Sequence, residues 1–300
     1  MPESVPCALC GASELRPFFK GDAVESIVAT PANDFNCTAT ASAVRNSLVR
    51  CANCGLVFAS PRLTAAELAA KYRGMEDEAY LAELPSRRLT AAKNLNRIEA
   101  FAPRGRLLDI GCFTGTLLLE ARRRGWEVLG IEPSDWGAKQ ALSAGLPVVH
   151  GTLDTAVIEE GSFDVVVMGD VIEHLPDPRL AVEVAARALR AGGLLWMNTP
   201  NIESPVSRLM GRHWYNFIAA HIYYFSPSTI RALVESAGLT VEWVGSYRRW
   251  FTVGYWLQRG GRYSPALAKG TRGVARKLGL EERPIPLDLG DHLQVFARKR

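Results

Sequence analysis

Residues 107–115 read "LLDIGCFTG", an apolar strand-like run that contains Asp109 and then breaks at two glycines, Gly111 and Gly115. A glycine turn between a strand and a helix can cradle a phosphate group. Neither the dinucleotide motif GxGxxG nor the Walker motif GxxxxGK[ST] fits here, because the turn reads GCFTG and no lysine follows it. The turn therefore favours a ligand that places no phosphate at this position.

The sequence around the turn alternates between strand and helix patterns. Such alternation predicts a doubly wound α/β fold, in which a parallel sheet carries helices on both faces. The expected strands are 106–110, 126–132, 147–152, 163–172 and 194–201, and the expected helices are 115–125, 135–145 and 177–193. Open sheets of this kind bind ligands beyond the carboxyl ends of their strands, where the strand order reverses.

An acidic residue stands at the end of the second expected strand. An acid about 20 residues after a glycine turn can bind both hydroxyls of a ribose, and Glu132 occupies this place. Together with Asp109, which precedes the turn, it indicates a site for an adenosine that carries no phosphates.

Three segments carry a family resemblance: the turn itself, "VLGIEPS" at 128–134 and "FDVVVMGDVIEHLPDP" at 163–178. In this order and spacing they resemble a class I S-adenosylmethionine-dependent methyltransferase with a Rossmann-like sheet, over roughly residues 105–200. The resemblance makes S-adenosyl-L-methionine the expected cofactor.

For the methionine part of this cofactor, the resemblance implies contacts along the turn. Gly111, Cys112 and Gly115 would lie along it, with Asp109 at its amino group. Phe113 departs from the family pattern, which usually has glycine there because glycine allows close backbone approach. We count Phe113 among the cofactor residues and expect its ring to turn aside.

For the adenosine part, the resemblance implies contacts from the next two loops. Glu132 would hold the ribose, and Pro133 and Ser134 would lie near the adenine. Thr152 and Leu153 would flank the adenine ring.

The chain after the fifth expected strand resembles bacterial methyltransferases that act on sugars and other small metabolites. Its sequence "HIYYFSPSTIRALVESAGL" starts at His221, and Ser226 is expected to cap a helix that has Pro227 at its first position. The patterns at 239–248 and 292–299 predict two further strands, which make the sheet seven-stranded.

A positioned base assists methyl transfer when the acceptor is a hydroxyl or an acidic carbon. We expect His221 to be this base, with Tyr224 as a nearby polar group and His174 as the second candidate. The resemblance implies that Asp170 closes the cofactor site from the fourth strand. Both histidines have a structural alternative, in which His221 fixes its loop and His174 supports the start of a helix.

A metal-dependent alternative also stays open at this strand end. In ubiquinone-type O-methyltransferases a related run carries a catalytic metal, so Asp170, Glu173 and His174 form a candidate site for a divalent cation.

Two CxxCG knuckles precede the sheet: Cys7 with Cys10, and Cys51 with Cys54. Each two-residue gap lets both thiolates turn toward one ion, and four thiolates form a closed tetrahedral Zn²⁺ site of structural type. The alternatives are buried free cysteines and a redox CxxC, which fits poorly because no helix pattern follows either pair. We expect a small zinc-ribbon module.

The stretch 248–280 is basic and aromatic. It contains no acid and eight basic residues, namely Arg248, Arg249, Arg259, Arg262, Lys269, Arg272, Arg276 and Lys277. An anionic or phosphorylated substrate, a membrane surface and RNA are each compatible with this pattern. The alternative without any ligand is a solvent-exposed basic face on an insertion that covers the sheet.

Composition limits the remaining choices. Apolar residues make up 48% of the chain and the formal net charge is +4, which is ordinary for a globular protein and too small to predict a nucleic-acid partner by itself. The N-terminus lacks the pattern of a signal peptide and no apolar run reaches the ~20 residues of a spanning helix, so we expect a cytoplasmic protein.

The predicted organisation has four parts: a zinc-ribbon module at 1–62, a helical connector at 63–104, the cofactor domain at 105–247, and a basic aromatic insertion with the last strand at 248–300. The predicted function is methyl transfer to oxygen or carbon of a small metabolite, such as a sugar or a secondary-metabolite intermediate. The alternatives are an RNA methyltransferase and a protein that binds the cofactor without turnover.

Overall fold

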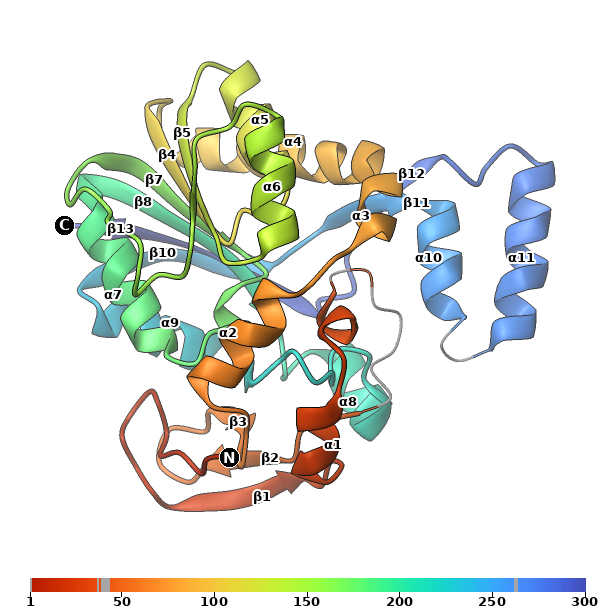
Figure 1. Cartoon of the computed structure of the whole chain (residues 1–300), viewed down its shortest axis with the longest axis horizontal. Helices are drawn as coiled ribbons and strands as arrows, with labels where there is room; N and C mark the ends of the chain where they lie inside the picture. Colours follow the sequence, from red (N-terminus) through yellow and green to blue (C-terminus); the bar gives the residue numbers. More distant parts are fainter. Residues whose placement is uncertain (1, 37, 39–43, 262–263) are drawn as a thin grey trace.

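Seven strands form the central sheet: β4 (Arg106–Ile110), β5 (Glu127–Glu132), β6 (Val148–His150), β7 (Phe163–Gly169), β8 (Leu189–Pro200), β10 (Leu239–Ser246) and β13 (His292–Lys299). Their order is β10-β13-β8-β7-β4-β5-β6, and all of them except β6 are labelled in Figure 1. The computed structural model describes residues 2–36, 38, 44–261 and 264–300. β13 runs antiparallel to β8 and β10, whereas β4 to β8 are parallel. The predicted seven-stranded α/β fold is confirmed.

Helices cover both faces of this sheet. One face carries α4 (Leu84–Phe101), α5 (Thr116–Arg123) and α6 (Asp135–Ser143), and the other carries α7 (Pro178–Ala188) and α9 (Pro227–Ser236). Successive strand residues point to opposite faces, so Leu107 packs in the core under α4 and α5 and Leu108 in the core under α7 and α9.

The strand order reverses beside β4. The chain proceeds from β4 to β5 on one side, whereas β7 pairs with β4 on the other side. The loops that follow β4 and β7 therefore diverge, which leaves a crevice at the carboxyl ends of these strands.

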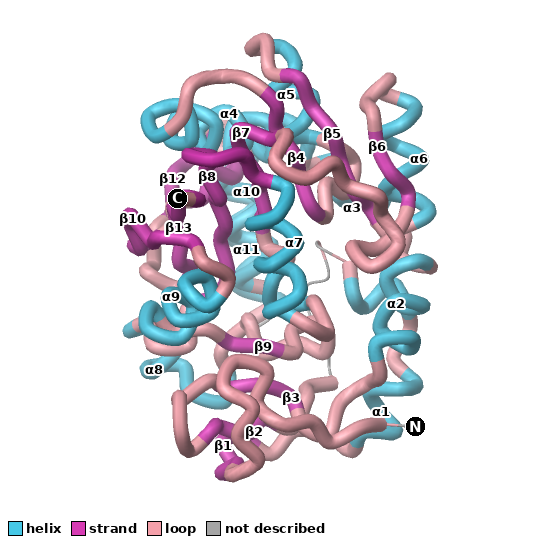
Figure 2. Tube along the Cα trace, turned by 90° about the vertical axis from the view of Figure 1, so that its left-hand side faces the viewer, coloured by secondary structure: helices cyan, strands magenta, loops and turns pink. Residues whose placement is uncertain are grey.

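A second, antiparallel sheet contains the cysteine pairs. Its strands are β1 (Leu15–Phe19), β2 (Leu48–Cys51), β3 (Val57–Ala59) and β9 (Tyr223–Tyr224), in this order. The helix α1 (Val24–Ala29) and the 3-10 turn η1 (Ala32–Phe35) lie between β1 and β2. Figure 2 shows β9 beside β3, although some 160 residues separate them in the sequence. Nothing in the two-residue β9 pattern predicted this pairing.

Two short helices, α2 (Ala65–Arg73) and α3 (Glu78–Ala82), connect this module to α4. Thr64 and Glu67 form a capping box at the start of α2. The loops after β7 and β8 contain the 3-10 turns η2 (Ile172–His174) and η3 (Gly211–His213) and the short helix α8 (Pro205–Met210).

The basic stretch forms an arm beside the sheet. Strands β11 (Arg249–Thr252) and β12 (Pro284–Leu287) pair antiparallel, and α10 (Val253–Gly260) and α11 (Pro265–Lys277) project from them (Figure 1). Arg262 lies outside the described residues. Among the residues that are described, no helix is both long enough and apolar enough to cross a membrane.

Candidate active site

A cavity of about 910 Å³ opens at the carboxyl ends of β4, β5 and β7. Most of the residues assigned to the cofactor from the sequence line it, namely Asp109, Gly111, Cys112, Phe113, Glu132, Pro133, Thr152, Leu153 and Asp170. Gly115 and Ser134 stand at helix starts instead. Gly115 occupies the N-cap position of α5, and Ser134 caps α6 by accepting a hydrogen bond from Gly137 N at 3.0 Å.

The two glycines of the turn are required by geometry. Gly111 and Gly115 have φ values of +73° and +72°, in the left-handed region. A Cβ on Gly111 would lie 2.6 Å from Val171 Cγ2, and one on Gly115 would lie 2.3 Å from Leu146 Cδ1. No larger residue fits either position without a shift of its neighbour.

Phe113 also has a positive φ, +48°, which is strained for a residue with a side chain. Its ring packs edge-on against Tyr80, with ring centroids 4.7 Å apart, and at a tilt of 40° against Trp136, with centroids 5.4 Å apart. The ring thus belongs to the wall that α3 and α6 form, while the backbone N–H of Phe113 points to Glu132.

Glu132 is held by backbone donors on both oxygens. Phe113 N donates to Oε2 at 2.7 Å and Ser134 N donates to Oε1 at 2.8 Å. Burial raises the pKa of Glu132 to about 7, although these two hydrogen bonds lower it. Each oxygen keeps a second lone pair, so a neighbouring pair of hydroxyls can donate to this carboxylate.

Asp109 is buried at the same end of the sheet. Burial, and next the charge of Glu132, raises the pKa of Asp109 to about 8. A cationic group bound in this part of the cavity would favour the ionised form of both acids. Cys112 lies against Gly130, where a Cβ would meet its Sγ at 2.5 Å, and burial raises the pKa of this thiol.

His174 and His221 meet at the opposite side of the cavity, with ring centroids 4.7 Å apart. His174 Nδ1 lies 2.9 Å from Ala220 O, and His221 Nδ1 lies 2.9 Å from Asn216 O. A carbonyl oxygen only accepts hydrogen bonds, so each Nδ1 carries a proton and each neutral ring keeps its lone pair on Nε2. Burial lowers the pKa of both histidines, so both are neutral bases near neutral pH.

Glu173 lies beside this pair and is buried. It accepts a hydrogen bond from Thr199 Oγ1 at 3.0 Å, and burial, followed by the charge of Asp170, raises its pKa. One oxygen of Glu173 and one ring nitrogen from each of His174 and His221 lie within 4.8 Å of one another. The candidate cation site expected from the sequence consisted of Asp170, Glu173 and His174. In the structure, His221 takes the place of Asp170 in this group.

Tyr224 lies behind His221 rather than in the cavity. Its hydroxyl donates to Asn216 O at 3.3 Å, and its ring packs against Phe217 and Trp214. It is absent from the residues that line the cavity. Tyr72, from α2, lines the cavity instead, and its hydroxyl lies 2.8 Å from His174 Nδ1.

A network of charged groups lies on the side of β13. Asp170, with φ +53°, accepts a hydrogen bond from Asn198 Nδ2 at 2.6 Å. His292 Nε2 lies 3.8 Å from Asp170, and His292 Nδ1 lies 3.0 Å from Asp291. Arg249 donates to Asp291 at 3.1 Å.

Sequence reasoning missed three of these cavity residues: Tyr72, Arg249 as a wall residue, and His292. His292 belongs to no local motif. It reaches the cavity only because β13 pairs with β8, which places His292 opposite Pro200 at the end of β8. The arm adds an aromatic wall of Phe251, Tyr255 and Trp256.

The arm is also less cationic than its composition indicated. Arg272 and Arg276 donate to Glu281 at 2.5 and 2.8 Å, and Glu281 lies one residue beyond the basic stretch.

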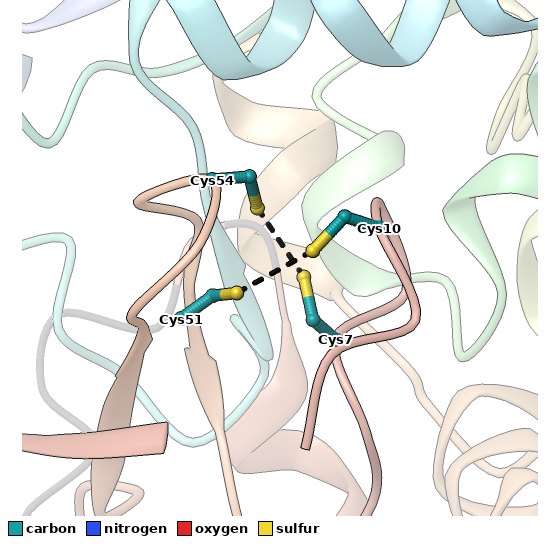
Figure 3. Close-up of side chains that lie close together, drawn as sticks. All are labelled: Cys7, Cys10, Cys51 and Cys54. Atoms are coloured by element: carbon teal, nitrogen blue, oxygen red, sulfur yellow. Dashed lines mark hydrogen bonds between the residues drawn. The ribbon is translucent and has the colours of Figure 1, made fainter. Parts of the chain in front are cut away.

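The four cysteines of the two knuckles converge (Figure 3). Cys7 Sγ lies 3.4 Å from Cys54 Sγ, and Cys10 Sγ lies 3.5 Å from Cys51 Sγ. All four are free thiols, without disulfides. Sulfurs that surround one Zn²⁺ at ~2.3 Å in a tetrahedron are about 3.8 Å apart, so the cluster needs only a small adjustment to hold this ion.

Comparison with known proteins identifies relatives over the central sheet. A family model described as a methyltransferase domain matches residues 83–244, which is more than half of the chain. A ubiquinone biosynthesis O-methyltransferase from Xanthomonas euvesicatoria is 31% identical over 162 residues, which cover 48% of this chain and 67% of the relative. The mitochondrial enzyme of the same name from Homo sapiens is 31% identical over 170 residues, or 50% of this chain and 46% of the relative.

Solved structures share the fold. An S-adenosylmethionine-dependent methyltransferase from Thermotoga maritima superposes with a TM-score of 0.52 at 20% identity, over 74% of this chain and 94% of the other. The YcgJ protein from Bacillus subtilis superposes with a TM-score of 0.51 at 20% identity, over 70% of this chain and 98% of the other.

Proposed function

We propose that this chain, which belongs to the methyltransferase-domain family, transfers the methyl group of S-adenosylmethionine to an oxygen or carbon of a small acceptor. The observation that carries the proposal is the pair of buried acids at the glycine turn, Asp109 and Glu132, because they match a cationic amino acid joined to a ribose without phosphates.

The cofactor supplies an electrophilic methyl group on a sulfonium sulfur. Glu132 would accept the two ribose hydroxyls, since both its oxygens are already oriented by Phe113 N and Ser134 N. Asp109 would pair with the amino group, which removes the cost of a buried carboxylate without a cation. Pro133, Thr152 and Leu153 would form the adenine pocket, and Asp170 would border the site from β7.

We infer that His221 acts as the general base toward the acceptor. Its Nδ1–H is fixed by Asn216 O, so Nε2 is free to accept a proton. His174 lies next to it in the same tautomer and is the second candidate. Tyr224 would act indirectly, by supporting the carbonyl of Asn216.

The acceptor is proposed to be a small molecule of sugar or secondary-metabolite type. Support comes from the aromatic and polar walls that enclose the cavity, formed by Tyr72, Phe251, Tyr255 and Trp256. The O-methyltransferase names of the curated relatives favour oxygen as the attacked atom. An RNA acceptor is less well supported, since Glu281 neutralises part of the basic arm.

The cysteine cluster is proposed to bind one structural Zn²⁺. Four thiolates leave no open coordination position for water, so the ion would stabilise the small sheet rather than take part in the reaction.

Calorimetric titration with S-adenosylmethionine tests the proposed cofactor. We expect one molecule bound per chain. Failure to bind at millimolar ligand, in protein that is folded by circular dichroism, would refute the proposal.

A further inference from the structure

The segment that carries His221 is held in part by the cysteine module, which we define as the described residues up to Arg62, with Cys7, Cys10, Cys51 and Cys54. We define the His221 segment as residues 217–224, whose last two residues form β9. β9 pairs antiparallel with β3, and Ala59 N donates to Ile222 O at 2.8 Å. On its other side, Ile222 N donates to Glu173 O at 2.9 Å in the main domain. The segment therefore ends as the edge strand of the small sheet, where Figure 2 shows β9 beside β3, and it contacts the main domain through Ile222 N.

Asn46, which precedes β2, makes the most direct contact with this segment. Its side-chain nitrogen donates to Ala219 O at 2.9 Å and to His221 O at 3.1 Å. Because both partners are carbonyl oxygens, only the amide nitrogen can face them, and the orientation of the amide is defined. Asn46 is only 4% exposed, so water cannot replace it easily.

Arg62, after β3, ties the same region to the loop that follows His174. Its guanidinium donates to Tyr223 Oη at 2.8 Å and to Pro176 O at 3.0 Å. The cysteine module thus contacts the chain on either side of His221 and, at Pro176, the chain after His174. By contrast, Asp109 and Glu132 stand on strands of the main sheet, and the donors to Glu132 come from the loops after β4 and β5.

We propose that Asn46 is a positioning residue for His221, and that the cysteine module completes the acceptor half of the active site without contributing to the cofactor half. Asn46 fixes two of the three carbonyls at 219–221 and thereby sets the direction of the imidazole. The catalytic consequence rests on the proposed role of His221, whereas the structural coupling does not.

The test compares Asn46→Ala with Ser47→Ala in the full-length protein. Ser47 is the matched control, because its hydroxyl accepts from Gly21 N inside the module and, within the described part of the chain, makes no hydrogen bond to the His221 segment. Hydrogen exchange of residues 217–224, measured by mass spectrometry, is expected to accelerate at least tenfold in Asn46→Ala and to stay within twofold in Ser47→Ala. The dissociation constant for S-adenosylhomocysteine is expected to stay within twofold in both variants.

Nitrogen NMR of the histidine rings provides a second readout, the tautomer of His221. A general loss of stability would not change this tautomer. The Nδ1–H tautomer of His221, assigned through His221→Gln, should give way to a mixture of tautomers in Asn46→Ala only. Unchanged exchange and an unchanged tautomer in Asn46→Ala would overturn the proposal, as would equal effects in Ser47→Ala.

If Asn46→Ala does not fold, exchange of the unmodified protein in graded denaturant decides the matter. Residues 217–224 are expected to open together with 49–59 of the cysteine module. The proposal would be overturned if residues 217–224 opened together with the main-sheet strands 106–110 and 163–169 and independently of residues 49–59. A protein that shows the coupling but binds no S-adenosylhomocysteine would refute the proposed function and leave the coupling intact.

Discussion

Replacement of Glu132 by glutamine is expected to weaken cofactor binding by about 30-fold or more. The carboxylate accepts hydrogen bonds from Phe113 N and Ser134 N and is proposed to accept two more from the ribose. Glutamine keeps one oxygen and turns an NH₂ group toward one of these backbone donors. The loss of one charge-assisted hydrogen bond, at roughly 1.5–3 kcal/mol, together with the donor–donor conflict, gives about 2–4 kcal/mol.

The assay is calorimetric titration with S-adenosylhomocysteine at pH 8, where Glu132, with a pKa of about 7, is mostly ionised. Glu127→Gln is the matched control, because Glu127 stands at the other end of β5 with an exposed side chain. Binding to the control should equal that of the unmodified protein. A dissociation constant for Glu132→Gln within threefold of the unmodified value, in folded protein, would show that Glu132 does not hold the ribose.

Three further predictions concern the same cavity and the cysteine cluster. Burial raises the pKa of Asp109 to about 8 and of Glu132 to about 7, and the amino group of a bound ligand favours the ionised form of both acids. Affinity for S-adenosylhomocysteine should therefore rise between pH 6 and pH 8, and binding should release protons. Calorimetry in two buffers of different ionisation enthalpy measures both effects, and a pH-independent affinity contradicts the prediction. His221→Gln should lower turnover by a factor of about 10² or more at unchanged cofactor affinity, whereas His213→Gln, at an exposed position, should not; near-normal turnover would transfer the role of base to His174. Native mass spectrometry should find one zinc per chain, and protein without zinc, whose Cys7 and Cys51 alkylate freely, would refute the metal site.

The sequence predicted the central sheet and the position of the cavity at its edge well, because both depend on local patterns. The glycines of LLDIGCFTG need positive φ, and Glu132 follows at a spacing that strand and helix lengths determine. The approximate strand positions were confirmed, and the assigned cofactor residues mostly line one cavity.

The acceptor side was less predictable because it is assembled from distant segments. β9 pairs with β3 across the chain, and His292 reaches Asp170 only through the antiparallel pairing of β13 with β8. Tyr72 belongs to a short helix whose sequence shows only a capping box. The four-part domain division, the catalytic roles and the cytoplasmic location stay predictions.

Transfer of labelled methyl groups tests the central claim most directly. The protein is incubated with methyl-labelled S-adenosylmethionine and with separate small-molecule and RNA fractions of a cell extract. Label is expected in the small-molecule fraction, and His221→Gln should reduce its uptake. Label in RNA alone, or no transfer to any fraction by protein that binds the cofactor, would contradict methyl transfer to a small acceptor.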